Sequence, residues 1–458
     1  MYERHRDLFR LTKPYFVGQK HLERFAPSVE KEEFRWEGLG EGPLRRTPLF
    51  AEHKRLGARF VPFAGWEMPV WYSSVGEEHR AVREAAGLFD LGHMGVLEVS
   101  GEHATSLLDL ATTNYVRWLK PGESQYTYLL DPDGRVIDDL IVYCRTRERY
   151  LLVVNAVNAE KDLAWLQAVN SGEYLLDRRR PWIEPEGPAQ IRDLKAPEAG
   201  EDRRIDLALQ GPKSLSILKS LARPELAHRL GRLKRTAFLE DELAGIPVMI
   251  ARTGYTGEEF GYELLLHPDR AGELWQLLLE VGAEFGLKPA GLGARDSTRT
   301  EAGLPLYGHE IGGELEISPI EAGFEGYVKF HKPFFIGREA LLHRKREMKM
   351  TVVRFRMERK GVRLPKYGDP VVDRNGRFLG RVTSCALDTA GFLVGMAYIE
   401  RGASSEGTPL WIYSLPEREE KGLRGLGPGD RVPLPNEAKV IPRFHISRPI
   451  ALHAACQE

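Results

Sequence analysis

The sequence predicts a mixed α+β protein of several domains, the last of them built mainly from strands. The chain has 458 residues, enough for about three domains of ~150 residues each. Residues 124–155 contain three β-branched and aromatic segments separated by turns, which is typical of an antiparallel meander. From Met350 onward, strand-like segments alternate with turns such as Asp373-Arg-Asn-Gly376, which predicts a C-terminal β domain.

The amino-acid composition argues against several classes of protein. Lys and Arg total 65 against 66 Asp and Glu, so the net charge of -1 provides no overall field for nucleic acid or an anionic membrane. No apolar run approaches the ~20 residues that cross a bilayer. Cys144, Cys385 and Cys456 are far apart, which indicates neither a disulfide framework nor a cysteine-rich zinc site. We expect a cytoplasmic protein with no nucleic-acid or membrane partner.

The chain divides into three regions. Residues 1–44 are charged and end in Gly38-Leu-Gly-Glu-Gly-Pro43, so they are predicted to form an N-terminal extension over the main body, with the glycines as a hinge. Residues 45–345 alternate between strand and helix patterns and are assigned to two α+β domains. Residues 346–458 form the predicted β domain, with a Gly/Pro-rich insertion near 422–435.

The first half of the 45–345 region begins with a short polar helix over 77–86. The three meander strands follow, at 124–130, 135–144 and 149–155. The turn Asp131-Pro-Asp-Gly134 places proline and glycine where a tight connection needs them. Asn158 is then expected to cap a helix that closes at Gly172.

The second half of this region starts with a stretch that resembles a loop. Four prolines within residues 178–204 deny backbone donors to a sheet, so this segment is predicted to be a surface insertion. A helix is expected from Asp269 to Gly286, with Pro289 beyond it. Another is expected to present Arg295, for which an ordinary structural ion pair is the more frequent role.

The predicted strand Val136-Ile-Asp-Asp-Leu-Ile-Val-Tyr143 carries two carboxyl groups on faces that are otherwise apolar. Because side chains alternate along a strand, Asp139 shares a face with Ile137, Ile141 and Tyr143, and Asp138 faces the other way. A carboxylate in such a position loses hydration, which raises its pKa unless a partner compensates. Either aspartate is therefore a candidate acid, base or ligand anchor, and pairing with an arginine or with loop amides is equally compatible with the pattern.

A second candidate lies in the segment Arg252-Thr-Gly-Tyr-Thr-Gly-Glu258, which runs into a strand containing Glu263. Its glycines would let a flat ligand approach the backbone, and a carboxylate suits an amidine-like edge with two parallel donors. The competing interpretation is a tight hairpin with a solvent-facing glutamate.

Several common cofactor motifs are missing from the sequence. It contains no G-x-G-x-x-G, G-x-x-x-x-G-K-[ST], H-E-x-x-H or G-x-S-x-G pattern. We therefore expect no flavin, nicotinamide, ATP or metal site.

Nine short motifs, taken together and in order, resemble the glycine cleavage system T-protein family of tetrahydrofolate-dependent aminomethyltransferases. They are Arg46-Thr-Pro-Leu49, Phe63-Ala-Gly-Trp-Glu-Met-Pro69, Phe89-Asp-Leu-Gly-His-Met94, Ile137-Asp-Asp-Leu140, Val153-Val-Asn155 with Glu160-Lys-Asp162, Leu209-Gln-Gly-Pro212, Gly254-Tyr-Thr-Gly-Glu258, Ala294-Arg-Asp296 with Glu301-Ala-Gly303, and Pro319-Ile-Glu-Ala-Gly323.

The resemblance implies a three-domain cloverleaf around a central folate cavity, with a ferredoxin-like domain and a C-terminal β-barrel. It assigns the catalytic role to the second aspartate of the pair, Asp139. It places Glu263 on the pterin ring and Arg295 on the ligand. Further cavity-lining residues implied by the family are Tyr126, Ile141, Tyr143, Val153 and Asn155.

The implied reaction takes an aminomethyl group from the dihydrolipoyl arm of H-protein, releases ammonia and forms 5,10-methylenetetrahydrofolate. The implied partners are lipoylated H-protein and tetrahydrofolate as co-substrate. The alternative is a related tetrahydrofolate-dependent demethylase that acts on a small S-, N- or O-methylated donor, and a noncatalytic folate-binding protein is a third possibility. The family pattern is broken at Gly323-Phe-Glu-Gly326, where relatives usually carry a tryptophan, and this departure concerns the one-carbon donor more than the folate site.

Overall fold

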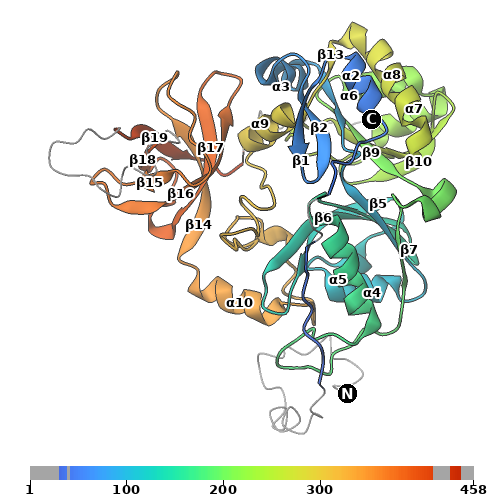
Figure 1. Ribbon diagram of the computed structural model, residues 1–458, viewed down its shortest axis with the longest axis horizontal. Helices are drawn as coiled ribbons and strands as arrows, with labels where there is room; N and C mark the ends of the chain where they lie inside the picture. The colour runs from blue at the N-terminus through green and yellow to red at the C-terminus, as the bar shows by residue number, and fades with distance from the viewer. Residues whose placement is uncertain (1–29, 39–41, 416–433, 445–458) are drawn as a thin grey trace, which may run out of the picture.

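The computed structural model describes residues 30–38, 42–415 and 434–444. It has three lobes, with the barrel on the left in Figure 1, a five-stranded sheet at the bottom and a six-stranded sheet at the upper right. This arrangement confirms the predicted α+β fold class with its C-terminal β-barrel. Of the predicted N-terminal extension, residues 1–29 and 39–41 lie outside the described part.

The five-stranded antiparallel sheet has the order β5-β6-β7-β4-β8. Its strands are β5 (Glu123–Leu130), β6 (Val136–Thr146), β7 (Arg149–Val154), β4 (Gly95–Ser100) and β8 (Gln190–Asp193). The first three are the predicted meander, within two residues at each end. Helices α4 (Ala104–Ala111) and α5 (Ala159–Ser171) bury their apolar sides against this sheet. The described end of the N-terminal extension also packs here, because the Phe34 ring lies 5.0 Å from that of Trp165.

Strand β8 corrects the expectation that residues 178–204 form only a surface loop. Residues 190–193 pair with the outer side of β4. They contain no proline, since Pro188 and Pro197 flank them, and they lie at the edge of the sheet, where one row of backbone groups needs no partner strand.

The six-stranded sheet has the order β10-β11-β12-β9-β3-β13, with only β13 and β3 parallel among its pairs. Its strands are β10 (Phe238–Leu243), β11 (Ile246–Ala251), β12 (Gly261–Leu266), β9 (Ile205–Gln210), β3 (Ala86–Asp90) and β13 (Leu287–Pro289). Helices on one face close its apolar core, as Figure 1 shows; they are α2 (Phe50–Arg55), α6 (Ser214–Leu221), α7 (Pro224–Arg232) and α8 (Ala271–Gly282). The helix predicted to end at Gly286 does so, with a 3₁₀ turn after α8 and Gly286 at φ 80°.

Two helices and a hairpin lie between this sheet and the barrel. Helix α3 (Val75–Glu84) begins at Ser74, whose side chain accepts the Glu77 amide, and α9 (Leu292–Ala302) carries Arg295. The hairpin consists of β1 (Arg59–Phe63) and β2 (Trp66–Trp71). The described connections also contain short 3₁₀ helices: η3 (Val116–Trp118), η4 (Pro197–Asp202), η5 (Pro268–Arg270), η6 (Ala283–Phe285), η7 (Glu325–Tyr327) and η8 (Arg401–Ala403).

The C-terminal lobe is a closed antiparallel barrel of order β14-β17-β16-β15-β18-β19 around its own apolar core. Its strands are β14 (Met350–Met357), β15 (Pro370–Val372), β16 (Phe378–Leu387), β17 (Leu393–Glu400), β18 (Pro409–Ile412) and β19 (Asn436–Ile441). Helix α10 (Arg338–Glu347) leads into it. Most of the predicted Gly/Pro-rich insertion, residues 422–433, lies outside the described chain.

One apolar cluster joins the two sheets, with Tyr143 and Leu151 on one side and Met249 and Leu265 on the other. Because the sheets meet face to face there, side chains at the border of this cluster lie between two domains. None of the helices in the described ranges is long and apolar enough to span a membrane.

Candidate functional site

A cavity of about 230 Å³ lies between the two sheets and reaches the segment that leads to the barrel. Strands β5, β6 and β7 contribute one wall, and β9 with β12 contribute another. Seven of the eight predicted site residues line it: Tyr126, Asp139, Ile141, Val153, Asn155, Glu263 and Arg295. Tyr143 does not line the cavity, but its hydroxyl contacts Glu263 from behind, at 2.8 Å.

The structure separates the two aspartates of β6. Asp139 lines the cavity, whereas Asp138 is fully buried beneath it. The alternation expected from the sequence holds from 138 to 143 but fails before it, because a β-bulge interrupts the pairing with β5 near Ile137. Ile137 therefore packs in the cluster of Leu140 and Val142 and does not share a face with Asp139.

Asp139 is held by two neutral donors. The Tyr126 hydroxyl donates to Oδ2 at 2.7 Å, and the Asn155 side-chain amide donates to Oδ1 at 2.9 Å. Burial, followed by the negative charge of Asp138, raises the pKa of Asp139 to about 7. A carboxyl group with such a pKa exchanges a proton near neutral pH, which suits acid–base work.

Asp138 is tied to the scaffold instead. Its Oδ2 accepts the Asn155 backbone amide at 2.9 Å, and its Oδ1 accepts the side-chain amides of Asn155 at 2.9 Å and Asn158 at 2.5 Å. The predicted start of helix α5 at Asn158 and its end at Gly172 are confirmed, but the Asn158 side chain does not bond to the helix. Asn158 occupies the N-cap position without a side-chain cap bond, because its amide is bound to Asp138. Asn155 links both aspartates and fixes the orientation of the cavity-facing one.

Glu263 occupies the opposite wall, on β12, and is only 6 % exposed, so it is not the solvent-facing residue of a plain hairpin. One of its oxygens, Oε2, accepts hydrogen bonds from Tyr143 and from the Thr253 hydroxyl. Burial raises the pKa of Glu263, while these two donors and the charge of Arg295 oppose that rise. Oε1 takes no part in these two bonds, so it can accept a hydrogen bond from a ligand in the cavity.

Arg295 projects from helix α9 into the same cavity. Its guanidinium lies over the Tyr255 ring, 4.9 Å from the ring centre. Arg299 of this helix makes ion pairs with Asp296 and Glu310. The structural ion pair expected for Arg295 is thus made by its neighbour one turn later.

Some residues that line the cavity were not predicted from the sequence. Tyr327, which follows Gly326 where the family's tryptophan is missing, puts an aromatic ring 4.9 Å from that of Tyr126. Asp206 on β9 also lines the cavity and is fully buried. The sequence feature that could have identified Asp206 resembles that of β6: an acidic residue lies within an apolar run, here Ile205-Asp-Leu-Ala-Leu209.

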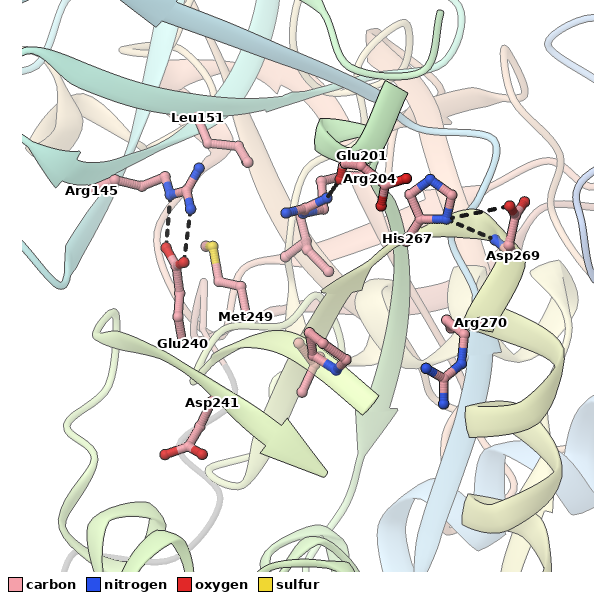
Figure 2. Close-up of a pocket in the computed structure, with 13 residues that line it drawn as sticks. Arg145, Leu151, Glu201, Arg204, Glu240, Asp241, Met249, His267, Asp269 and Arg270 are labelled. Atoms are coloured by element: carbon pink, nitrogen blue, oxygen red, sulfur yellow. Dashed lines mark hydrogen bonds and ion pairs between the residues drawn. The ribbon is translucent and has the colours of Figure 1, made fainter. Parts of the chain in front are cut away.

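A second cavity, of about 430 Å³, opens at the other border of the apolar cluster between the sheets (Figure 2). Its charged side chains largely satisfy one another. Arg145 makes two hydrogen bonds of 2.7 Å to Glu240, and His267 faces Asp269, as the dashed lines in Figure 2 show. The cavity with Asp139 and Glu263 combines desolvated acids with aromatic walls and is the better candidate site. Within the described ranges, no group of three or more His, Cys, Asp or Glu side chains is arranged to hold a metal ion.

Comparisons with known proteins find similarity over most of the chain. Residues 49–332 match the family described as GCVT N-terminal domain. The chain is 43 % identical to an aminomethyltransferase of Halothermothrix orenii over 371 residues, which cover 81 % of this chain and 95 % of the relative. It is 41 % identical to the aminomethyltransferase of Bacillus subtilis over 369 residues, with 80 % and 93 % covered. The crystal structure of the glycine cleavage system aminomethyltransferase T from Bartonella henselae superposes with a TM-score of 0.70 at 30 % identity, covering 87 % of this chain and 97 % of that one.

Proposed function

The chain belongs to the glycine cleavage T-protein family of aminomethyltransferases, and from this premise we propose how its cavity performs the family's reaction. The reaction releases ammonia from an aminomethyl group carried on a dihydrolipoyl arm and forms 5,10-methylenetetrahydrofolate. Two substrates must therefore meet in a site that excludes water. The cavity between the sheets, with its buried acids and aromatic walls, is the place where the described chain offers such a site.

The observation that carries the proposal is the state of Asp139. Its carboxyl faces the cavity, is removed from water and is held by Tyr126 and Asn155, with a pKa of about 7. We assign it two tasks: it accepts a proton from the attacking folate amine, and its negative charge stabilises the cationic carbon that develops as the sulfur leaves.

Glu263 and Arg295 position the folate substrate. The Glu263 carboxylate accepts from the amidine-like edge of the pterin ring through Oε1, while Tyr143 and Thr253 hold Oε2 and fix the orientation of the carboxylate. Arg295, stacked on Tyr255, supplies the positive charge at the same wall. A ring held at one edge presents its amine to Asp139 in a constant register, which lowers the entropic cost of the encounter.

The donor we propose is lipoylated H-protein, in line with the family. Tyr126, Ile141, Val153 and Asn155 would complete the walls around the reacting groups. The cytoplasmic location remains a prediction.

Turnover with the two natural substrates tests the proposal. The purified protein is incubated with aminomethylated H-protein and tetrahydrofolate, and ammonia and 5,10-methylenetetrahydrofolate are measured. We expect both products from the wild type, and Asp139→Asn should lower kcat by about 10²–10⁴-fold while folate still binds. The matched control is Asp133→Asn, an acid in the turn of the same hairpin that pairs with Arg178, and it should keep full activity.

Two outcomes contradict this assignment. Near-normal turnover by Asp139→Asn would remove the proposed proton acceptor. Formation of methyltetrahydrofolate from a small methylated donor, with no ammonia from H-protein, would make the chain a demethylase instead.

A further inference from the structure

Asp206 is a buried acid for which the cavity provides no partner. It lies on β9 opposite Leu265 of β12 and diagonally from Glu263, so both carboxyl groups point from the same face of the sheet. Its side chain is 0 % exposed and lines the cavity. Neither oxygen receives a hydrogen bond of normal geometry from the described residues. Such a group costs stability, and in native proteins it usually has a reason.

Two other buried acids, Asp90 and Glu263, lie near Asp206, and the hydrogen bonds that they accept distinguish them from it. Asp90 accepts hydrogen bonds from Thr47 at 2.6 Å and from the Gly92 amide at 2.7 Å, and it contacts His53 at 2.8 Å. These contacts favour an ionised Asp90.

Glu263 is likewise supported, by Tyr143 and Thr253. Asp206 has no such side-chain donor; the charge of Arg295, which also reaches Glu263, and a backbone contact from Leu264 oppose the rise of its pKa only in part. Burial and the charge of Glu263 raise the pKa of Asp206 well above its usual range, which favours its protonated, neutral form.

We propose that Asp206 is a second ligand-binding group beside Glu263, and that its O–H donates a hydrogen bond to an acceptor on the same heteroaromatic ring whose N–H groups Glu263 binds. Diagonal neighbours on paired strands are separated by roughly 7 Å at Cβ, a spacing that one ring edge can bridge. The ligand edge must then combine adjacent donors with an acceptor. A 2-amino-4-oxopyrimidine edge has this pattern, whereas a 2,4-diamino edge replaces the acceptor oxygen by a donor.

This inference rests on the proposed folate function and adds to it a residue that selects the oxo form of the ring. The selection follows from the cost of an unmatched buried group. When a diamino ring binds, the carbonyl oxygen of Asp206 can accept from the 4-amino group, but its O–H then has no acceptor and stays unpaired, or the acid ionises, in a site poor in water.

Two variants and two ligands test the proposal. Asp206→Asn keeps a neutral donor of similar size, and Asp206→Leu removes the polar group. Affinities are measured by calorimetry for 5-formyltetrahydrofolate, which has the 4-oxo edge, and for its 2,4-diamino analogue. We expect Asp206→Asn to bind the oxo ligand within about threefold of wild type and Asp206→Leu to bind it roughly 10-fold more weakly, the loss of about one hydrogen bond to a buried partner. The preference for oxo over diamino should persist in Asp206→Asn and shrink in Asp206→Leu, where only Glu263, which accepts from the ring N3–H that the diamino ring lacks, still discriminates.

Thermal unfolding of the ligand-free variants separates binding from folding. Because Asp206 is an unsatisfied buried acid, Asp206→Leu should be at least as stable as wild type, and Asp206→Ala provides a second apolar variant. If Asp206→Leu binds both ligands as the wild type does, or loses the same factor for both, the proposal is overturned while the folate function stands. If the wild type binds neither ligand, the folate function itself fails.

Discussion

The Tyr143 hydroxyl donates a hydrogen bond of 2.8 Å to Oε2 of Glu263, across the interface between the two sheets. Tyr143 lies on β6, the strand that also carries Asp139, while Glu263 lies on β12 of the other sheet. The strand that carries the proposed proton acceptor therefore also orients the proposed ring-binding carboxylate. Relative movement of the two domains would disturb both groups together.

Tyr143→Phe tests this link. It keeps the buried ring and removes one hydrogen bond to a charged acceptor, which we expect to weaken folate binding by about 10-fold. Because the bond from Tyr143 lowers the pKa of Glu263, its loss raises that pKa further, and the acid limb of a plot of affinity against pH should move to higher pH. Calorimetric titrations over a pH series give both values.

Tyr150→Phe is the matched control. Its hydroxyl contacts Thr105 at 2.6 Å, away from the cavity, so its removal should leave folate affinity unchanged. Equal losses in the two variants would show that Tyr143 acts through general packing.

Strand alternation and turn chemistry explain why the meander and the barrel were predictable. Both depend on local patterns, such as Asp131-Pro-Asp-Gly134, whose preferred geometry is also the one that the fold uses. Strand β8 was missed because its pairing with β4 joins segments about ninety residues apart, and the flanking prolines dominate the local signal. Asn158 shows a similar effect, since a tertiary partner takes the side chain that would otherwise cap its helix.

The site was predictable in part for the same reason. A carboxyl group inside an apolar strand can be recognised in the sequence. Which face of the strand each side chain occupies cannot, because a bulge near Ile137 interrupts the alternation. The family resemblance was needed to choose Asp139 over Asp138. The pairing of Tyr143 with Glu263 depends on how two domains dock, which no local pattern contains.

The rate of the proposed reaction should depend on the ionisation of Asp139. If its carboxylate accepts the proton, kcat rises with pH through about 7. The Tyr126 hydroxyl bonds to the ionised form and lowers the pKa, so Tyr126→Phe should shift the midpoint of this rise to higher pH and reduce the rate at pH 7 by a few fold. Single-turnover rates between pH 5.5 and about 9 would measure it. A midpoint that does not move would assign the titration to another group.

Asp139 should also limit the stability of the protein. Its pKa rises from an ordinary value of 3.8 to about 7 on folding, so the folded state binds this proton more tightly than the unfolded state does. The stability associated with the protonated acid is complete below the unfolded pKa and is lost as pH rises through about 7. Asp139→Asn should therefore unfold at the wild-type temperature near pH 4 and about 2–4 °C higher at pH 8.

Differential scanning calorimetry at both pH values checks this sign. The control is Asp133→Asn, because the hydrogen bond from Arg178 lowers the pKa of Asp133, which predicts no gain in stability at pH 8. A lower unfolding temperature for Asp139→Asn at pH 8 would contradict the direction of the pKa shift.

Glu301 joins the six-stranded domain to the barrel. It lies on α9 and is 5 % exposed, and its Oε2 contacts His79 at 2.8 Å and accepts from Arg83 at 2.7 Å. Its Oε1 accepts the backbone amide of Thr389, between β16 and β17, at 3.1 Å. Burial alone would raise the pKa of Glu301, but the bond from His79 and the charge of Arg83 hold it well below the ordinary value of 4.5.

Glu301→Gln should consequently destabilise the protein near pH 7. A depressed pKa means that the stability from this carboxylate is complete above the unfolded pKa and is lost as pH falls below about 4.5. Gln keeps the size but not the charge, so Arg83 and His79 lose their charged acceptor, and we expect a loss of about 2–3 kcal/mol in the free energy of unfolding, measured by urea titration at pH 7. Glu273→Gln removes a carboxylate from an exposed pair with Arg270 and should leave the unfolding midpoint unchanged. Since Glu301, unlike Glu273, contacts two lobes, a similar midpoint for both variants would mean that this network adds nothing to the docking of the barrel.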